Sequence, residues 1–145
     1  MMHESMVRVS IPSELGYEKI VMSTVASLAQ KANLSPERID DLKTATGEAV
    51  INAIEHGNQL SPSFSVLTVA FIKDNSLVVN VMDQGLHPMT ATNTHPRPQM
   101  RQRGWGLYLI RELVDEVTLT TTSTHNELQM VIHLDSPPEP TAKPA

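Results

Sequence analysis

The sequence predicts an α+β fold, a two-layer sandwich in which about three helices cover one face of a mixed, mostly antiparallel sheet. Two observations support this prediction. Runs in which apolar and polar residues alternate, as in half-buried strands, occur near the amino terminus and again in the second half of the chain. Longer segments in which apolar residues recur every three or four positions, as on one side of a helix, separate them. The predicted order is therefore strand, helix, helix, two strands, loop, helix and two strands.

The first predicted elements are a strand and a long helix. Apolar residues alternate over residues 7–11, and Pro12 ends this strand because proline cannot donate a hydrogen bond to a sheet. Residues 13–32 carry apolar side chains at helical spacing, among them Leu15 and Ile20, which we assign to the buried side. The pattern predicts that the helix follows the strand almost directly.

A second helix is predicted over residues 35–56. Ser35 can cap free N–H groups, and Pro36 suits the first helical position, where no N–H is needed. Gly57 is the predicted terminator. Gly47 lies inside the helix, where glycine costs about 1 kcal/mol relative to alanine. Another group is therefore expected to approach the backbone closely at Gly47.

Two hairpins are predicted in the second half of the chain. Strands at residues 64–73 and 77–82 are joined by Asp74-Asn75-Ser76, a composition typical of tight turns. Strands at residues 117–123 and 127–135 surround His125-Asn126. Apolar and polar residues alternate along the last of these strands, so one of its faces is expected to lie on the core.

A loop and a helix separate the two hairpins. Residues 84–103 show no apolar period and are longer than most connections, which is typical of a functional segment. Residues 105–115 are predicted to be helical. We expect one domain over residues 1–135, followed by a disordered, proline-rich tail over residues 136–145.

Composition narrows the class of protein. The chain has 145 residues and no cysteine, which excludes disulfides and thiolate metal sites. A net charge of −5 argues against a nucleic-acid scaffold, whose affinity depends on Lys and Arg. No segment approaches the roughly 20 apolar residues of a membrane-spanning helix. We therefore expect a cytoplasmic protein that binds neither nucleic acid directly nor membrane.

Glu48 and Asn52 are polar residues in an otherwise apolar helical segment. At a spacing of four they share one side of the helix. The Asn52 amide oxygen suits Mg²⁺, a hard cation that takes only one or two protein ligands. The Glu48 carboxylate could accept a proton from a hydroxyl near a γ-phosphate. Taken alone, an ordinary hydrogen-bonded pair is the more common explanation, so the pair needs support from other motifs.

Asp83-Gln-Gly85 follows the apolar strand at residues 77–82. The Asp83 carboxylate could accept a hydrogen bond from the exocyclic amine of adenine, and Gly85 would let the backbone approach the base. The competing explanation is a simple Asp-x-Gly turn. A zinc site formed by Asp83 with His87 and His95 is disfavoured, because the spacing matches no compact zinc pattern and no cysteine assists.

Arg103-Gly-Trp-Gly-Leu107 opens the third predicted helix. A helix amino terminus offers free N–H donors to a phosphate, and Gly104 and Gly106 would let phosphate approach. Arg103 adds positive charge. Glycines at this place often serve the turn alone, but a preceding loop that closes over a nucleotide needs such hinges.

In order and spacing, these three motifs resemble the anti-sigma-factor serine/threonine kinases of bacteria, which belong to the ATPase superfamily of gyrase, histidine kinases and MutL. The resemblance covers about residues 7–134 and implies a Bergerat-type ATP-binding fold that binds ATP and Mg²⁺. It implies that Glu48 is the catalytic base, Asn52 the magnesium ligand and Asp83 the adenine reader. The nucleotide-binding residues it implies are Asn52, Asp83, Gly85, Arg103, Gly104, Gly106 and Leu107.

The resemblance also implies partners. They are an anti-anti-sigma (STAS-domain) protein, whose serine or threonine accepts the phosphate, and a sigma factor or similar regulator that is sequestered; a homodimer is implied too. The sequence departs from the Asp-x-Gly-x-Gly pattern of the superfamily, because His87 stands where the second glycine is expected. This difference bears on ATP affinity.

Two other functions fit the same motifs. A nucleotide-responsive regulatory binding module without significant kinase activity is the main alternative, because pocket motifs do not separate binding from catalysis. A stand-alone histidine-kinase catalytic domain is the third possible function. It is disfavoured because we expect no phosphoacceptor-histidine helix before the fold.

Overall fold

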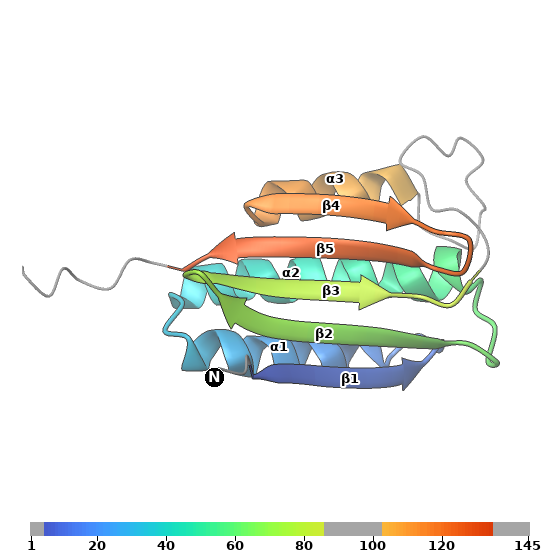
Figure 1. The fold of residues 1–145 in the computed structure, drawn as a ribbon, viewed down its shortest axis with the longest axis horizontal. Helices are drawn as coiled ribbons and strands as arrows, with labels where there is room; N and C mark the ends of the chain where they lie inside the picture. Colours follow the sequence, from blue (N-terminus) through green and yellow to red (C-terminus); the bar gives the residue numbers. More distant parts are fainter. Residues whose placement is uncertain (1–4, 86–102, 135–145) are drawn as a thin grey trace, which may run out of the picture.

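Five strands form one sheet in the computed structural model, which describes residues 5–85 and 103–134. The strand order is β1-β2-β3-β5-β4, and each neighbouring pair is antiparallel (Figure 1). The prediction of a mostly antiparallel sheet is confirmed, and the described strands contain no parallel pair. The strands are β1 (Met6–Pro12), β2 (Ser65–Lys73), β3 (Ser76–Met82), β4 (Glu116–Thr121) and β5 (Asn126–His133).

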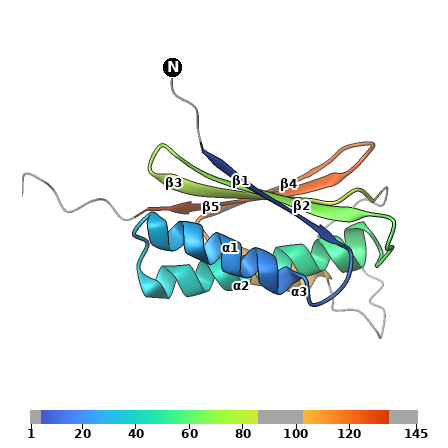
Figure 2. The same ribbon diagram turned by 90° about the horizontal axis from the view of Figure 1, so that it is seen from below.

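The helices lie together on one face of the sheet, as Figure 2 shows. They are α1 (Glu18–Lys31), α2 (Pro36–Asn52) and α3 (Arg103–Leu113), and α2 continues into a π-helical turn, η1 (Ala53–Gly57). The predicted α+β two-layer sandwich is therefore confirmed. Among the described helices, none combines the length and the apolar character that crossing a bilayer requires.

The hydrophobic core fills the space between the two layers. Full burial of one large aliphatic side chain stabilises the fold by roughly 1.5–3 kcal/mol. The largest completely buried apolar side chains come from both the helices and the sheet. They are Leu42, Ile54, Leu77, Ile110, Met130 and Ile132. Leu128, Met130 and Ile132 point to the core from β5, which confirms the predicted alternation of that strand.

The prediction that a helix begins at residue 13 was wrong, because α1 begins at Glu18. The Ser13 hydroxyl donates to the Phe64 carbonyl oxygen at 2.7 Å, which holds the chain in a turn. Gly16, at φ 109°, has a left-handed backbone that helices do not use. Leu15 and Ile20 were assigned to the buried side, but their exposed fractions are 49% and 51%.

The second helix begins as predicted. The Ser35 hydroxyl oxygen accepts a hydrogen bond from the Arg38 N–H at 3.3 Å, and Pro36 occupies the first turn. Gly47 faces α1, where a side chain at this position would lie 2.7 Å from the Met22 sulfur. The close approach expected at Gly47 is therefore confirmed.

The helical segment ends at Gly57, as predicted, but not with a left-handed glycine. The chain instead widens into η1, in which the Asn58 N–H donates to the Ala53 carbonyl oxygen at 2.8 Å. The left-handed residues are Gln59 and Leu60, with φ of 51° and 59°. Single π turns of this kind often accompany functional sites.

The remaining boundaries differ from the prediction by a few residues. The first hairpin turns at Asp74 and Asn75, both with positive φ, as a tight two-residue hairpin turn requires. Strand β4 ends at Thr121, two residues early, because the chain turns there, and β5 ends at His133. Helix α3 both begins and ends two residues before its predicted limits.

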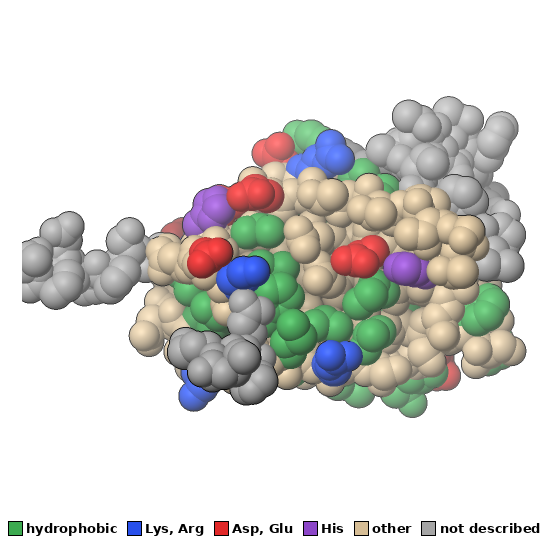
Figure 3. Space-filling model, viewed as in Figure 1, with side chains coloured by type: hydrophobic (Ala, Val, Ile, Leu, Met, Phe, Trp, Pro, Cys, Tyr) green, Lys and Arg blue, Asp and Glu red, His purple; other side chains and the backbone are tan. Residues whose placement is uncertain are grey.

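The second face of the sheet is not covered by any of the described helices. Figure 3, viewed from the side of Figure 1, shows hydrophobic side chains gathered over the middle strands, with acidic and histidine side chains nearby. Four apolar residues stand opposite one another across four strands, because Met6 pairs with Phe71, Phe71 with Val78 and Val78 with Val131. We call this uncovered surface the open sheet face.

Candidate functional site

Four segments that are distant in sequence meet at one end of the sandwich. The end of α2 with η1, the end of β3, the beginning of α3 and the turn between β4 and β5 all lie there (Figure 1). The three predicted motifs are on the first three of these segments. The fourth, the β4–β5 turn, was predicted only as a turn.

Glu48 and Asn52 lie against Gly106. A Cβ atom at Gly106 would be 3.1 Å from the Glu48 Oε1 atom, 3.1 Å from the Asn52 Nδ2 atom and 3.2 Å from the Asn52 Oδ1 atom. Only glycine leaves these two polar groups undisturbed. Asn52 is buried, whereas Glu48 is half-buried. The first and third motifs, more than fifty residues apart, therefore form one cluster.

The glycines at the third motif both lie inside helix α3. Helix α3 begins at Arg103, so Gly104 and Gly106 are both in its first turn, whereas the predicted helix over residues 105–115 left Gly104 before it. The N–H groups of a first helical turn have no partner within the helix and favour an anion. The side chains of residues 103–105 lie outside the described structure, so the phosphate-binding roles of Arg103 and Gly104 stay predictions.

Leu107 was included among the nucleotide-binding residues, but its side chain belongs to the hydrophobic core, where its exposed fraction is 5%. Residues 107 and 110 are three positions apart and anchor α3 to the core together. Only the backbone of Leu107 is thus left for a nucleotide. His87 and His95, and with them most of the long loop, lie outside the described residues, as does the tail over residues 136–145.

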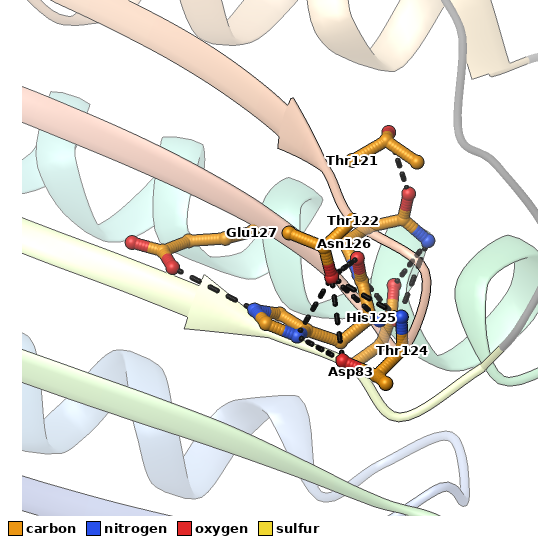
Figure 4. Close-up of polar contacts among 7 residues, drawn as sticks. All are labelled: Asp83, Thr121, Thr122, Thr124, His125, Asn126 and Glu127. Atoms are coloured by element: carbon orange, nitrogen blue, oxygen red, sulfur yellow. Dashed lines mark hydrogen bonds and ion pairs between the residues drawn. The ribbon is translucent and has the colours of Figure 1, made fainter.

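Asp83 is a buried carboxylate of the site, with an exposed fraction of 2%. It follows β3 directly, as predicted. Its Oδ1 atom accepts the N–H groups of Gly85 and Asn126 at 3.1 Å and 3.0 Å. The Asn126 side-chain amide donates to Oδ1 at 3.3 Å and to Oδ2 at 3.1 Å (Figure 4). Asp83 is therefore held in one orientation by groups from its own loop and from the β4–β5 turn.

Burial raises the pKa of the Asp83 carboxyl group. The hydrogen bonds from Asn126 and Gly85 and the nearby His125 ring oppose this rise, because each favours the charged form. The carboxylate thus depends on these donors for its charge.

Gly57 and Gly85 allow two backbone segments to touch beside Asp83. A Cβ atom at Gly85 would overlap the Gly57 carbonyl oxygen, and one at Gly57 would overlap the Asp83 carboxylate. Gly85 was predicted to admit an adenine base close to the backbone. The described contact is instead with η1, and the approach of a base stays a prediction.

Asn58 also contributes to this end of the molecule, although its place after Gly57 is the only sign of this role in the sequence. Its side-chain amide donates to the Ser13 hydroxyl at 2.7 Å and to the Ser65 carbonyl oxygen at 3.0 Å. Its Oδ1 atom accepts the Gln84 N–H at 2.8 Å. Asn58 thereby joins the end of β1, the start of β2 and the segment that carries Asp83.

The donor set of this site fits magnesium better than zinc. Residues 5–85 and 103–134 hold no group of three or more His, Cys, Asp or Glu side chains placed to bind a metal. Mg²⁺ does not need one, because it keeps most of its waters and accepts one or two protein oxygens. The buried Asn52 amide, beside the Glu48 carboxylate, offers such an oxygen.

Comparison with known sequences also finds similarity to ATP-binding proteins. The histidine kinase-like ATPase domain family matches residues 11–132. The serine-protein kinase RsbW of Bacillus velezensis is 31% identical over 128 residues, which cover 81% of this chain and 79% of the relative. The serine-protein kinase RsbW of Staphylococcus epidermidis is 29% identical over 123 residues, which cover 78% of this chain and 77% of the relative.

Solved structures share the fold. The RsbU and RsbW domains of a Mycobacterium tuberculosis protein give a TM-score of 0.68 at 19% identity, covering 92% of this chain and 33% of that one. This chain therefore spans about a third of that protein. The histidine kinase domain of a blue-light activated kinase from Erythrobacter litoralis gives a TM-score of 0.55 at 17% identity, covering 81% of this chain and 61% of that one.

Proposed function

Because the chain belongs to the histidine kinase-like ATPase family, we propose that it is an ATP-dependent protein serine/threonine kinase that acts as an anti-sigma factor. The observation that carries this proposal is the contact of Glu48 and Asn52 with Gly106 in the first turn of α3. It brings a candidate base and a candidate metal ligand to the N–H groups that would receive the phosphates. The similarity of the chain to two serine-protein kinases supports the same reaction.

In the proposed reaction, the hydroxyl oxygen of a serine or threonine attacks the γ-phosphorus of ATP, the bond to the β-phosphate oxygen breaks and ADP leaves. Glu48 accepts the hydroxyl proton, a role that requires a carboxylate near the γ-phosphate and open to the acceptor. Its half-buried position suits that role. Asn52 would hold Mg²⁺, which when bound offsets the negative charge of the phosphates.

The two ends of ATP would then bind to different segments. At the end of β3, beside Gly85, the Asp83 carboxylate accepts a hydrogen bond from the exocyclic amine of adenine. The free N–H groups of α3, with Gly104 and Gly106, bind the phosphates, and the Arg103 guanidinium adds positive charge. The end of β3, which Asp83 follows, and the first turn of α3, which contains Gly106, lie at the same end of the sandwich (Figure 1), and this supports the placement.

The proposed partners are an anti-anti-sigma protein with a STAS domain, which accepts the phosphate, and a sigma factor or similar regulator, which the kinase sequesters in the cytoplasm. A net charge of −5 supports a protein partner rather than direct binding to nucleic acid.

A homodimer is proposed through the open sheet face. The row formed by Met6, Phe71, Val78 and Val131 is apolar, and an uncovered apolar surface of this kind typically marks an interface. Basic residues lie on β1 and β2, toward one edge of the sheet, and acidic residues lie on β4 and β5, toward the other edge, so a two-fold axis parallel to the strands would bring opposite charges together. The basic residues are Arg8 and Lys73, and the acidic ones are Glu116 and Glu127.

Replacing Phe71 with glutamate is expected to shift the protein from dimer to monomer, because the new carboxylate would be buried against the same face of the second copy. Sedimentation equilibrium would report the change, from twice the 16.0 kDa of one chain to a single chain. Ile20→Glu, at an exposed position on α1 in the other layer, is the control and should stay dimeric. A wild-type monomer, or a dimeric Phe71→Glu variant, would contradict the proposed interface.

Isothermal titration calorimetry tests the nucleotide site. We expect ATP to bind with one molecule per chain and more tightly when Mg²⁺ is present. Asn52→Ala should lose most of the Mg²⁺ effect, because the amide oxygen is the proposed ligand. Absence of ATP binding would contradict the proposed function. A nucleotide-responsive module without catalysis would pass this test and fail a phosphoryl-transfer assay.

A further inference from the structure

Asn126 holds the proposed adenine reader from the opposite hairpin. Its backbone N–H and its side-chain amide together make three contacts of 3.0–3.3 Å with the Asp83 carboxylate and reach both oxygens. Both residues are almost completely buried, with exposed fractions of 1% for Asn126 and 2% for Asp83. Figure 4 shows the two side chains facing each other between the end of β3 and the β4–β5 turn.

The hydrogen bonds of the Asn126 side chain fix which end of its amide faces Asp83. An ionised carboxylate only accepts hydrogen bonds, so the Asn126 NH₂ group must face Asp83. The Asn126 Oδ1 atom then faces the other way, where it accepts the Thr121 hydroxyl at 2.8 Å. Thr121 therefore holds the amide in the orientation that donates to Asp83. The three residues form a chain of donors that ends on the carboxylate.

The β4–β5 turn, which leads directly into Asn126 at the start of β5, is itself held by several contacts. The Thr122 N–H donates to the His125 carbonyl oxygen at 2.9 Å, and the Thr122 hydroxyl to the same oxygen at 3.1 Å. The His125 ring lies 3.1 Å from the Thr124 hydroxyl and 3.9 Å from the Glu127 carboxylate. Asn126 is thus presented to Asp83 from an ordered turn.

We propose that Asn126 is a positioning residue that orients the Asp83 carboxylate and thereby selects a 6-amino purine over a 6-oxo purine. This inference rests on the proposed function, in which Asp83 reads the base. A carboxylate attracts the 6-amino group of adenine, which is a donor, and repels the 6-oxo group of guanine, which is an acceptor. A neutral carboxyl group could donate to that oxygen, so discrimination requires the charged form.

Asn126 also supports the charged form. Burial raises the pKa of Asp83, and the hydrogen bonds of Asn126 lower it. Removing the amide would leave the Asn126 N–H, the Gly85 N–H and the His125 ring as the remaining favourable groups. The carboxyl group would then be freer to rotate and to take up a proton. Both changes weaken the preference for adenine.

The test compares ATP and GTP binding by calorimetry, with Mg²⁺, in the wild type and in Asn126→Ala. We expect the variant to bind ATP about tenfold to hundredfold more weakly, the range for a lost hydrogen bond to a charged group. GTP binding should change less, so that the ratio of the two affinities falls at least about threefold. Circular dichroism would establish that the variant is folded. Asn80→Ser, on the strand that Asp83 follows but on the open sheet face, is the control and should keep the wild-type ratio.

A second variant exchanges the carboxylate of Asp83 and the amide of Asn126. In the double variant Asp83→Asn with Asn126→Asp, the amide and the carboxylate still pair. The new carboxylate at position 126 would still accept the Thr121 hydroxyl, and the new amide at position 83 can donate to a 6-oxo group. We expect this variant to recover thermal stability lost in Asn126→Ala and to bind GTP at least as well as ATP.

The outcomes distinguish a failure of the role proposed for Asn126 from a failure of the proposed function. Wild-type ATP preference that persists unchanged in folded Asn126→Ala would overturn the role of Asn126 and leave the kinase proposal standing. The same preference in the exchanged variant would show that Asp83 does not read the base, and would overturn the role of Asn126 with it. A wild-type chain that binds neither nucleotide would overturn the proposed function and the role of Asn126 with it.

Discussion

Replacing Glu48 with glutamine is expected to lower the rate of phosphoryl transfer by about 10²- to 10⁴-fold, the usual contribution of a general base. Glutamine has nearly the same shape as glutamate, so the contact with Gly106 is kept. It cannot accept a proton from the attacking hydroxyl. ATP binding should stay near the wild-type affinity, because the proposed binding groups are Asn52, Asp83 and the first turn of α3.

The measurement is a single-turnover transfer of labelled phosphate, together with ATP affinity by calorimetry. Glu37→Gln, at the other end of the same helix, is the control and should transfer phosphate at the wild-type rate. Equal rates for the wild type and Glu48→Gln would remove Glu48 from the chemistry. A loss of ATP affinity as large as the loss of rate would make Glu48 a binding residue instead.

Replacing Gly85 with alanine is expected to damage both the fold and the nucleotide site. The new Cβ would overlap the Gly57 carbonyl oxygen, and a backbone atom cannot move aside without moving η1. Overpacking of this kind costs about 1–3 kcal/mol of unfolding free energy, and each kcal/mol lowers the melting temperature by about 2–4 °C at this chain length. Because η1 also contacts the Asp83 carboxylate, ATP affinity should fall by at least about tenfold.

Gly47→Ala is the matched control for this prediction. The three heavy atoms nearest to a Cβ at Gly47 all belong to the Met22 side chain, at 2.7–3.3 Å, and this side chain is flexible and can adjust. Alanine also favours a helix by about 1 kcal/mol over glycine. Gly47→Ala should therefore be as stable as the wild type or more so, and should bind ATP normally. Similar melting temperatures for the two alanine variants would show that the contact between Gly57 and Gly85 is not tight.

The sequence predicts the elements of this fold well where the relevant contacts are local. Ser35 and Pro36 mark the start of α2 because a capping hydroxyl needs only the N–H three residues later. The start of α1 was wrong because it depends on the Ser13 hydroxyl and the Phe64 carbonyl oxygen, 51 residues away. Helical spacing of apolar residues does not reveal such a contact.

The difference between local contacts and contacts that are distant in sequence also explains which site residues could be predicted. Glu48 and Asn52 could be recognised because four residues separate them, and Asp83 because it follows an apolar strand. Asn126 was missed because its partner, Asp83, lies 43 residues away in sequence, so that it resembled any asparagine in a turn. Gly57 was recognised as the end of the helix, but its close approach to the Asp83 carboxylate was missed for the same reason.

The most direct test of the account is phosphoryl transfer to a protein acceptor. The purified chain would be incubated with γ-labelled ATP, Mg²⁺ and the STAS-domain protein of the same organism, and the acceptor would be analysed by mass spectrometry. We expect label on one serine or threonine of the acceptor, formed in step with ADP and strongly reduced with Glu48→Gln. An acceptor that stays unlabelled while the chain binds ATP tightly would contradict the kinase assignment and favour a nucleotide-responsive binding module.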